Sequence, residues 1–304
     1  MLAQPAAEEL VGRTAELAAV ASALDELERG RCAVLTVLGE PGIGKTSLLR
    51  ALGALADRRG LLVLAGSASE LERDLPFGVF TDALDDYVQT LEPHRLDALE
   101  ADVRTELGEV LPSLAAAPGA ATDHRFRTHR AVRRLLEVLA TPKPLVLILD
   151  DLHWADSGSV ELLGAMLRRP PAASVLLALA ARPRQATARL WAAFERAAAT
   201  VAHTRLELGA LSAVDARSLL AGRLAPAGAD ALYAQAGGNP FYLRQLARAP
   251  APGAAAMSDG DDPVGEAGVW WPAEAAGELD ALALLPSYVG RRAIVARVGP
   301  VEIP

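Results

Sequence analysis

The strongest constraint on the fold is a glycine-rich loop, Gly39-Glu40-Pro41-Gly42-Ile43-Gly44-Lys45-Thr46. It follows residues 33–38, an apolar and partly β-branched run typical of a buried strand, and precedes residues 46–59, which have a helical pattern. Glycines let the backbone curl close to an anion, so successive N–H groups can surround a phosphate at a helix N-terminus. An ordinary glycine turn is the alternative, but it does not require the lysine and threonine that follow.

The polar side chains of the loop predict which ligand it binds. Lys45 can neutralise the β- and γ-phosphates of a nucleoside triphosphate, and the Thr46 hydroxyl can bind Mg²⁺. We therefore expect ATP and Mg²⁺ as cofactors, because the sequence has no Asn-Lys-x-Asp motif for guanine. The predicted phosphate-binding residues are Gly39, Glu40, Pro41, Gly42, Ile43, Gly44, Lys45, Thr46 and Ser47.

A second apolar run, residues 145–149, ends in two acids, Asp150 and Asp151. Mg²⁺ needs oxygen ligands, and a hydrolytic water needs a base or an orienting group. Asp150 is predicted to bind the metal together with Thr46, and Asp151 to polarise the water. The alternative is that the two acids only begin a turn and cap the next helix.

Arg182 directly follows a third apolar run, residues 175–181. If this strand lies beside the strand that ends at Asp150, Arg182 emerges near the γ-phosphate and can stabilise transition-state charge. A solvated loop arginine is the alternative.

Apolar strands alternate with helical segments along the first two thirds of the chain. This pattern predicts an α/β fold with a parallel sheet covered on both faces. The strands are expected at residues 33–38, 61–65, 145–149, 175–181 and 201–208. We expect a core at residues 1–209, a helical domain at residues 210–248, a flexible linker at residues 249–268 and an irregular tail at residues 269–304.

Composition excludes several classes of protein. The chain is 51% hydrophobic, but no apolar run approaches the roughly 18 residues of a membrane span. No secretory signal is visible, and the single cysteine rules out an intrachain disulfide. The net charge of −8 argues against non-specific binding of nucleic acid. We expect a cytoplasmic protein that neither enters a membrane nor binds nucleic acid directly.

Together, four motifs resemble the STAND branch of AAA-like P-loop ATPases, particularly the ATPase module of the large LuxR-type bacterial regulators. The similarity covers roughly residues 10–250. The motifs are Leu10-Val11-Gly12-Arg13, the phosphate loop, Leu149-Asp150-Asp151-Leu152-His153-Trp154-Ala155-Asp156 and Gly237-Gly238-Asn239-Pro240-Phe241-Tyr242-Leu243.

The resemblance implies a three-layer αβα P-loop NTPase fold with strand order 5-1-4-3-2 and a helical lid at residues 210–248. It implies that Val11, Gly12, Arg13 and Pro240 bind on the adenine side. Arg182 would be the sensor arginine and Asp151 the catalytic acid. From their place in the sequence, His153 and Trp154 are expected to pack the turn after the acidic pair, and a direct catalytic role for His153 is the alternative. The family has Glu after Gly-Arg where this chain has Thr14, so the adenine-side contacts are less defined.

The family also continues into a winged helix, helical repeats and a helix-turn-helix, for which residues 269–304 are too few. The tail is expected to be irregular, with a winged-helix remnant as one interpretation. We therefore expect either a shortened relative or a free-standing ATPase.

The predicted function is a slow Mg²⁺-dependent ATPase that acts as a molecular switch between ATP and ADP states. A protein partner, or self-association through the ATPase module, is expected. Two alternatives remain open: a nucleotide-clamped binding module with negligible hydrolysis, and the ATPase fragment of a transcriptional regulator. A small-molecule kinase fits the Gly-Asn-Pro motif less well.

Overall fold

The computed structural model describes residues 10–115 and 125–248. The predicted linker at residues 249–268 and the predicted tail at residues 269–304 lie outside the described residues. The chain divides into two compact units, Met1–Leu211 and Ser212–Pro304. Within the described ranges, no helix is both long and apolar enough to cross a membrane.

The first unit alternates strands and helices as the sequence predicts. In chain order its elements are α1 (Thr14–Glu28), β1 (Ala33–Gly39), α2 (Lys45–Arg58), β2 (Leu62–Ser67), η1 (Glu70–Glu72), α3 (Gly78–Gln89), α4 (Pro93–Leu96), α5 (Ala101–Leu107), η2 (Pro112–Leu114), α6 (Arg125–Leu139), β3 (Leu145–Asp150), η3 (Leu152–Trp154), α7 (Ser157–Arg168), β4 (Val175–Ala181), α8 (Ala188–Thr200) and β5 (Ala202–Leu208). The strand bounds differ from the predicted ones by at most two residues, because polar positions such as Ser67 continue the backbone ladder beyond the apolar run.

The five strands form one parallel sheet in the order β2-β3-β4-β1-β5. Read from the other edge, this is the predicted order 5-1-4-3-2, and the P-loop NTPase fold is confirmed. The central strands β1, β3 and β4 are buried along their whole length, whereas the edge strand β5 is exposed or half-buried at every residue before Leu208. Central strands of a covered parallel sheet are apolar on both faces, so the continuous apolar runs are explained by position.

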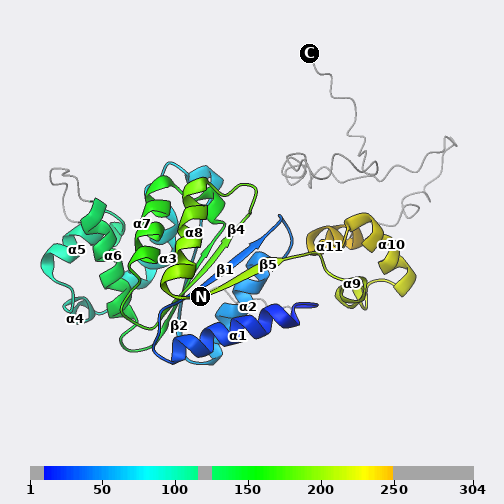
Figure 1. The fold of residues 1–304 in the computed structure, drawn as a ribbon, viewed down its shortest axis with the longest axis horizontal. Helices are drawn as coiled ribbons and strands as arrows, with labels where there is room; N and C mark the ends of the chain where they lie inside the picture. The colour runs from blue at the N-terminus through cyan, green and yellow to red at the C-terminus, as the bar shows by residue number, and fades with distance from the viewer. Residues whose placement is uncertain (1–9, 116–124, 249–304) are drawn as a thin grey trace, which may run out of the picture. The chain divides into compact units, whose positions relative to one another are not determined.

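Helices cover both faces of this sheet (Figure 1). The helices α1 and α2 share one buried apolar cluster with Val146 and Ile148 of β3. On the other face, α3, α6, α7 and α8 share a second cluster with Leu147 and Leu149, the alternate residues of the same strand. The unit therefore has three layers, and the carboxyl ends of β1, β3 and β4 lie along one edge of the sheet.

The described part of the second unit is helical, with α9 (Ala213–Leu220), α10 (Pro226–Ala236) and α11 (Pro240–Arg248). Ser212 caps α9 by accepting a hydrogen bond from the Asp215 N–H. Arg217 of α9 donates two hydrogen bonds to the Asp230 carboxylate of α10, at 2.6 and 3.0 Å. The role of these helices as a lid stays a prediction.

Candidate nucleotide-binding site

The phosphate loop joins the end of β1 to the start of α2, and two glycines explain its course. A Cβ added at Gly39 would lie 2.7 Å from Cγ2 of Ile43 and 3.2 Å from the Leu208 carbonyl, so the loop packs tightly against its own apolar residue. Gly44 precedes α2 with φ of 107°, a left-handed conformation that residues with a Cβ rarely adopt. The free N–H groups of the first turn of α2 therefore begin where the loop ends.

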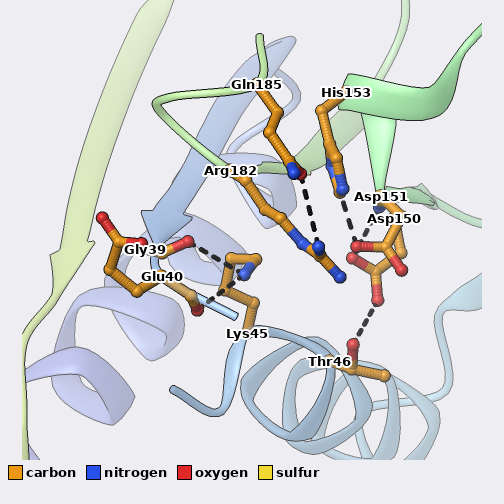
Figure 2. A network of polar contacts seen from close by, with 9 residues as sticks. All are labelled: Gly39, Glu40, Lys45, Thr46, Asp150, Asp151, His153, Arg182 and Gln185. Carbon is orange, nitrogen blue, oxygen red and sulfur yellow. Dashed lines mark hydrogen bonds and ion pairs between the residues drawn. The ribbon is translucent and has the colours of Figure 1, made fainter. Parts of the chain in front are cut away.

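Lys45 is buried at the start of α2 with its ammonium group held in the loop. Its Nζ donates hydrogen bonds to the carbonyl oxygens of Gly39, at 2.9 Å, and Glu40, at 3.1 Å (Figure 2). Burial lowers the pKa of Lys45, and the charge of Asp151 is the strongest opposing influence. A buried cation with two weak carbonyl partners is suited to binding an anion that enters the loop.

The Thr46 hydroxyl donates a 2.6 Å hydrogen bond to Oδ2 of Asp150, at the end of β3. The other carboxylate oxygen of Asp150, Oδ1, accepts the Asp151 N–H at 2.7 Å. Asp150 is buried, and the two hydrogen bonds hold its carboxylate in one orientation. The structure brings together the two residues predicted to bind Mg²⁺.

Asp151 follows β3 in a left-handed conformation, with φ of 50° and ψ of 35°. This conformation costs a residue other than glycine about 1–2 kcal/mol, and here it turns the chain from the strand into η3. Burial raises the pKa of the Asp151 carboxyl, and the neighbouring Asp150 charge acts in the same direction. Arg182 and Lys45 oppose that shift, so both cations lie close enough to act on this carboxylate.

Arg182 lies at the end of β4, which pairs directly with β3, with Leu149 opposite Leu179. The adjacency on which the Arg182 prediction depended is therefore present. Nη1 of Arg182 donates a 3.3 Å hydrogen bond to Gln185, and its guanidinium carbon lies 6.0 Å from the ring centroid of Trp154. Figure 2 shows this side chain extending from the end of β4 toward the acidic pair.

The turn after the acidic pair is held to the rest of the unit by Asp156 and Trp154. Asp156 caps α7 and also accepts hydrogen bonds from the backbone N–H groups of Phe77, at 3.0 Å, and Gly78, at 3.2 Å. The guanidinium carbon of Arg73 lies 4.2 Å from the centroid of the Trp154 ring, a cation–π contact. These contacts fix the segment that carries Asp151 and His153.

The segment Val11, Gly12 and Arg13 contacts the phosphate loop through the Arg13 side chain. Arg13 is buried, and its Nη2 donates hydrogen bonds to the carbonyl oxygens of Ile43, at 3.1 Å, and Gly209, at 2.6 Å. Val11 is half-buried, and Gly12 turns the chain with φ of 70°. Pro240 begins α11 in the second unit. Adenine contacts by these residues stay predictions.

The residues at this edge of the sheet fit Mg²⁺ and a triphosphate. The loop offers backbone N–H groups and one buried ammonium for phosphate oxygens, and it presents a hydroxyl and a carboxylate oxygen 2.6 Å apart for a hard cation. In the described ranges no group of three His, Cys, Asp or Glu side chains could hold a metal alone. Mg²⁺ usually keeps water and substrate oxygens among its ligands.

Sequence reasoning missed several polar contacts around these residues. Gln185 is the hydrogen-bond partner of Arg182, and no sequence motif indicates it. Arg184 forms a 3.4 Å ion pair with Glu40 of the phosphate loop. Both follow Arg182 closely in the sequence, which is the only signal that could have drawn attention to them.

A glycine-rich loop between β1 and α2, acids at the end of β3 and an arginine at the end of β4 define a P-loop nucleotide-binding protein of the α/β class. Residues 9–179, more than half of the 304-residue chain, match the family model of the AAA ATPase domain. The chain belongs to this family.

The chain is similar to a bacterial protein and to two proteins of solved structure. The uncharacterized protein R02095 of Rhizobium meliloti (strain 1021) is 27% identical over 277 residues, which cover 78% of this chain and 24% of that protein. The chain thus spans about a quarter of the length of this relative.

Among solved structures, the ORC2 protein of Aeropyrum pernix, in ADPNP-ADP complexes, matches with a TM-score of 0.51 and 17% identity, covering 78% of this chain and 61% of that one. Cdc6p from Pyrobaculum aerophilum matches with a TM-score of 0.52 and 14% identity, covering 81% and 63%. At these identities the likeness shows the fold alone.

Proposed function

We propose that this chain hydrolyses ATP slowly with Mg²⁺ and acts as a molecular switch in signal transduction, in the manner of the STAND ATPase module of LuxR-type regulators. The observation that carries the proposal is the 2.6 Å contact between Thr46 and Asp150, beside the buried Lys45. A phosphate-binding lysine and a pair of oxygens suited to Mg²⁺ at one sheet edge are the parts that phosphoryl transfer requires.

Each side chain has a distinct part in this proposal. Lys45 and the loop N–H groups bind phosphate oxygens, and Thr46 with Asp150 would hold Mg²⁺, which supplies charge neutralisation when bound. Asp151 accepts a hydrogen bond from the attacking water and takes its proton. Arg182 neutralises charge that develops on the transferred phosphoryl group.

The switch depends on groups that respond to the γ-phosphate. Arg182 and Asp151 lose their phosphate and water partners when ATP becomes ADP, so the two nucleotides favour different states of the site. We propose that residues 210–248 act as the lid that reports this difference, with Pro240 and the segment Val11, Gly12 and Arg13 on the adenine side.

A pair of lysine variants tests the ATPase proposal. Lys45 and Lys143 are the only lysines of the chain, and Lys143 is exposed between two prolines, so Lys143→Ala is a matched control. We expect Mg²⁺-dependent phosphate release from the purified wild-type chain and from Lys143→Ala, and none above background from Lys45→Ala. Equal release from all three proteins would contradict the proposal.

Asp151→Asn separates an ATPase from a nucleotide clamp. We expect this variant to keep ATP affinity and to lose most of its turnover, because only the proton acceptor is removed. If the wild-type chain binds ATP but releases no phosphate, and Asp151→Asn changes nothing, the clamp is the correct function.

The output of the switch is proposed to be a protein contact or self-association in the cytoplasm, with no direct binding of nucleic acid. The net charge of −8 supports this proposal. Light scattering with ATP and with ADP should reveal a nucleotide-dependent change in assembly or in partner binding. Fluorescence anisotropy showing ATP-dependent binding of duplex DNA at physiological salt would contradict the proposal.

A further inference from the structure

His153 is a buried polar residue to which the proposed ATPase mechanism gives no part. It lies in η3, two residues after Asp151, and its side chain has 0% exposure. Neither ring nitrogen, Nδ1 or Nε2, has a hydrogen-bond partner among the described residues. A buried imidazole without partners costs about 1–3 kcal/mol, and such groups in native proteins usually have a functional reason.

The ring is directed toward the acidic pair. Nδ1 of His153 lies 3.9 Å from Oδ1 of Asp151, and Figure 2 shows the imidazole pointing at this carboxylate. A hydrogen bond requires about 2.7–3.2 Å, so a movement of less than about 1.5 Å would form one. Asp151 is the residue that turns the chain here, with φ of 50°, and a small adjustment of its side chain closes the distance.

The neighbouring groups fix the protonation of the ring. Burial lowers the pKa of His153 to about 3, and the charges of Arg182, Lys45 and Arg73 act in the same direction. The imidazole is therefore neutral at neutral pH, with one N–H and one acceptor nitrogen. Facing a carboxylate, Nδ1 has to carry the proton, which leaves Nε2 as an acceptor. Nε of Arg182 is a buried donor that also lacks a partner among the described residues.

Packing alone is a weaker explanation for this side chain. His153 does contact the Trp154 ring, with centroids 5.0 Å apart. A leucine or phenylalanine would fill the same space without leaving two nitrogens unsatisfied. What the imidazole adds to an apolar residue is a donor directed at Asp151.

We propose that His153 is a positioning residue for Asp151, whose carboxylate accepts the Nδ1–H hydrogen bond when the site holds Mg²⁺ and ATP. This bond fixes the carboxylate in one orientation while it takes the proton of the attacking water. The inference rests on the proposed ATP hydrolysis, and one of its two tests does not depend on turnover.

The first test is the tautomer of His153, measured by NMR on chain labelled with ¹⁵N-histidine, in Mg²⁺ and a non-hydrolysable ATP analogue. The signals of the five histidines are assigned by their loss in variants, with His153→Phe removing the relevant pair. We expect the Nδ1–H tautomer in the wild type and a change toward Nε2–H in Asp151→Ala. An Nε2–H tautomer in the wild type would overturn the proposal.

The second test separates the two nitrogens by substitution. Asn places an amide N–H near the position of Nδ1, whereas Gln places it near Nε2. We expect His153→Phe and His153→Gln to lower kcat by roughly 10- to 100-fold, with little change in the ATP dissociation constant, and His153→Asn to recover most of the loss. His203→Phe is the control, since His203 lies near the start of β5 and contacts Thr36 at 3.0 Å.

The outcomes decide the two proposals separately. Equal kcat in wild type and His153→Phe, or equal loss in the Asn and Gln variants, would overturn the positioning role while leaving the ATPase intact. A wild-type chain without turnover would overturn the ATPase, and the tautomer would still decide whether His153 holds Asp151. If His153→Phe does not fold, the Asn and Gln variants and the tautomer remain decisive.

Discussion

The Thr46 hydroxyl donates a 2.6 Å hydrogen bond to the Asp150 carboxylate, from a residue 104 positions away in the sequence. The contact joins the start of α2 to the end of β3, on two strand-helix units that are not consecutive in the sheet. Both oxygens are of the kind that Mg²⁺ prefers, so Thr46 and Asp150 would hold the ion in place of the hydrogen bond that now joins them.

This pair predicts a shared effect on Mg²⁺ dependence. We expect Thr46→Val and Asp150→Asn each to raise the Mg²⁺ concentration for half-maximal turnover by about tenfold or more, because the first removes an oxygen ligand and the second removes the negative charge of the other. The double variant should be little worse than Asp150→Asn alone, since both residues act on one ion. Thr90→Val, at the exposed end of α3, is the control. Fully additive losses would argue that the two residues act separately.

Arg182 is expected to act on the chemical step. Arg182→Ala should lower kcat by roughly 10²–10³-fold while changing ADP affinity little, because the guanidinium neutralises charge that develops during transfer. Arg182→Lys should have nearly the same low kcat as Arg182→Ala, because lysine lacks the planar guanidinium group that contacts Gln185. Phosphate release and equilibrium nucleotide binding measure the two quantities. The control is Arg189→Ala, because the Arg189 side chain is 73% exposed. Loss of ADP binding in Arg182→Ala would contradict the prediction, since it would show that Arg182 binds the nucleotide before the chemical step.

Gly39→Ala is expected to destabilise the first unit. The added Cβ would lie 2.7 Å from Ile43 and 3.2 Å from the Leu208 carbonyl, so either the loop or the end of β5 has to move. Such overpacking costs about 1–3 kcal/mol, and the moved loop should also bind ATP more weakly. Gly53→Ala within α2 is the matched control, because its Cβ would meet side chains at an ordinary 3.5 Å. Chemical denaturation of both variants checks the difference, and equal stabilities would refute the prediction.

His153 should make stability depend on pH. Its pKa is about 3 in the folded chain and 6.5 in the unfolded reference, so between these values the unfolded state binds the extra proton. The contribution of the neutral His153 to the free energy of unfolding is therefore fully present above about pH 6.5, and it is lost as pH decreases toward 3. Between about pH 7 and pH 5 the wild type should lose about 2 kcal/mol more than His153→Phe. Denaturant unfolding at both pH values measures this, and parallel losses in the two proteins would contradict it.

The phosphate loop could be predicted from local sequence, because its glycines, Lys45 and Thr46 lie in one short segment and their chemistry depends on their spacing. Asp150 and Arg182 could be inferred because polar residues after apolar strands emerge at one sheet edge. The strand order came from family resemblance and is confirmed.

Contacts between distant segments could not be predicted in the same way. Nothing near Asp156 indicates that it accepts the N–H groups of Phe77 and Gly78, about 80 positions earlier. The aromatic character of the turn at His153 suggested packing, and only the surrounding geometry reveals two buried nitrogens without partners. Such features depend on how helices and loops meet, which a pattern along one segment does not encode.

The bonds of Arg13 have a practical consequence for dissecting the protein. One guanidinium group holds a carbonyl of the phosphate loop and the carbonyl of Gly209, two residues before the end of the first unit. The beginning and the end of that unit are therefore tied through a single side chain, 196 positions apart. An expression fragment that starts after residue 13, or stops before residue 209, would leave one end of this tie without its partner. Fragments of the nucleotide-binding unit should include both.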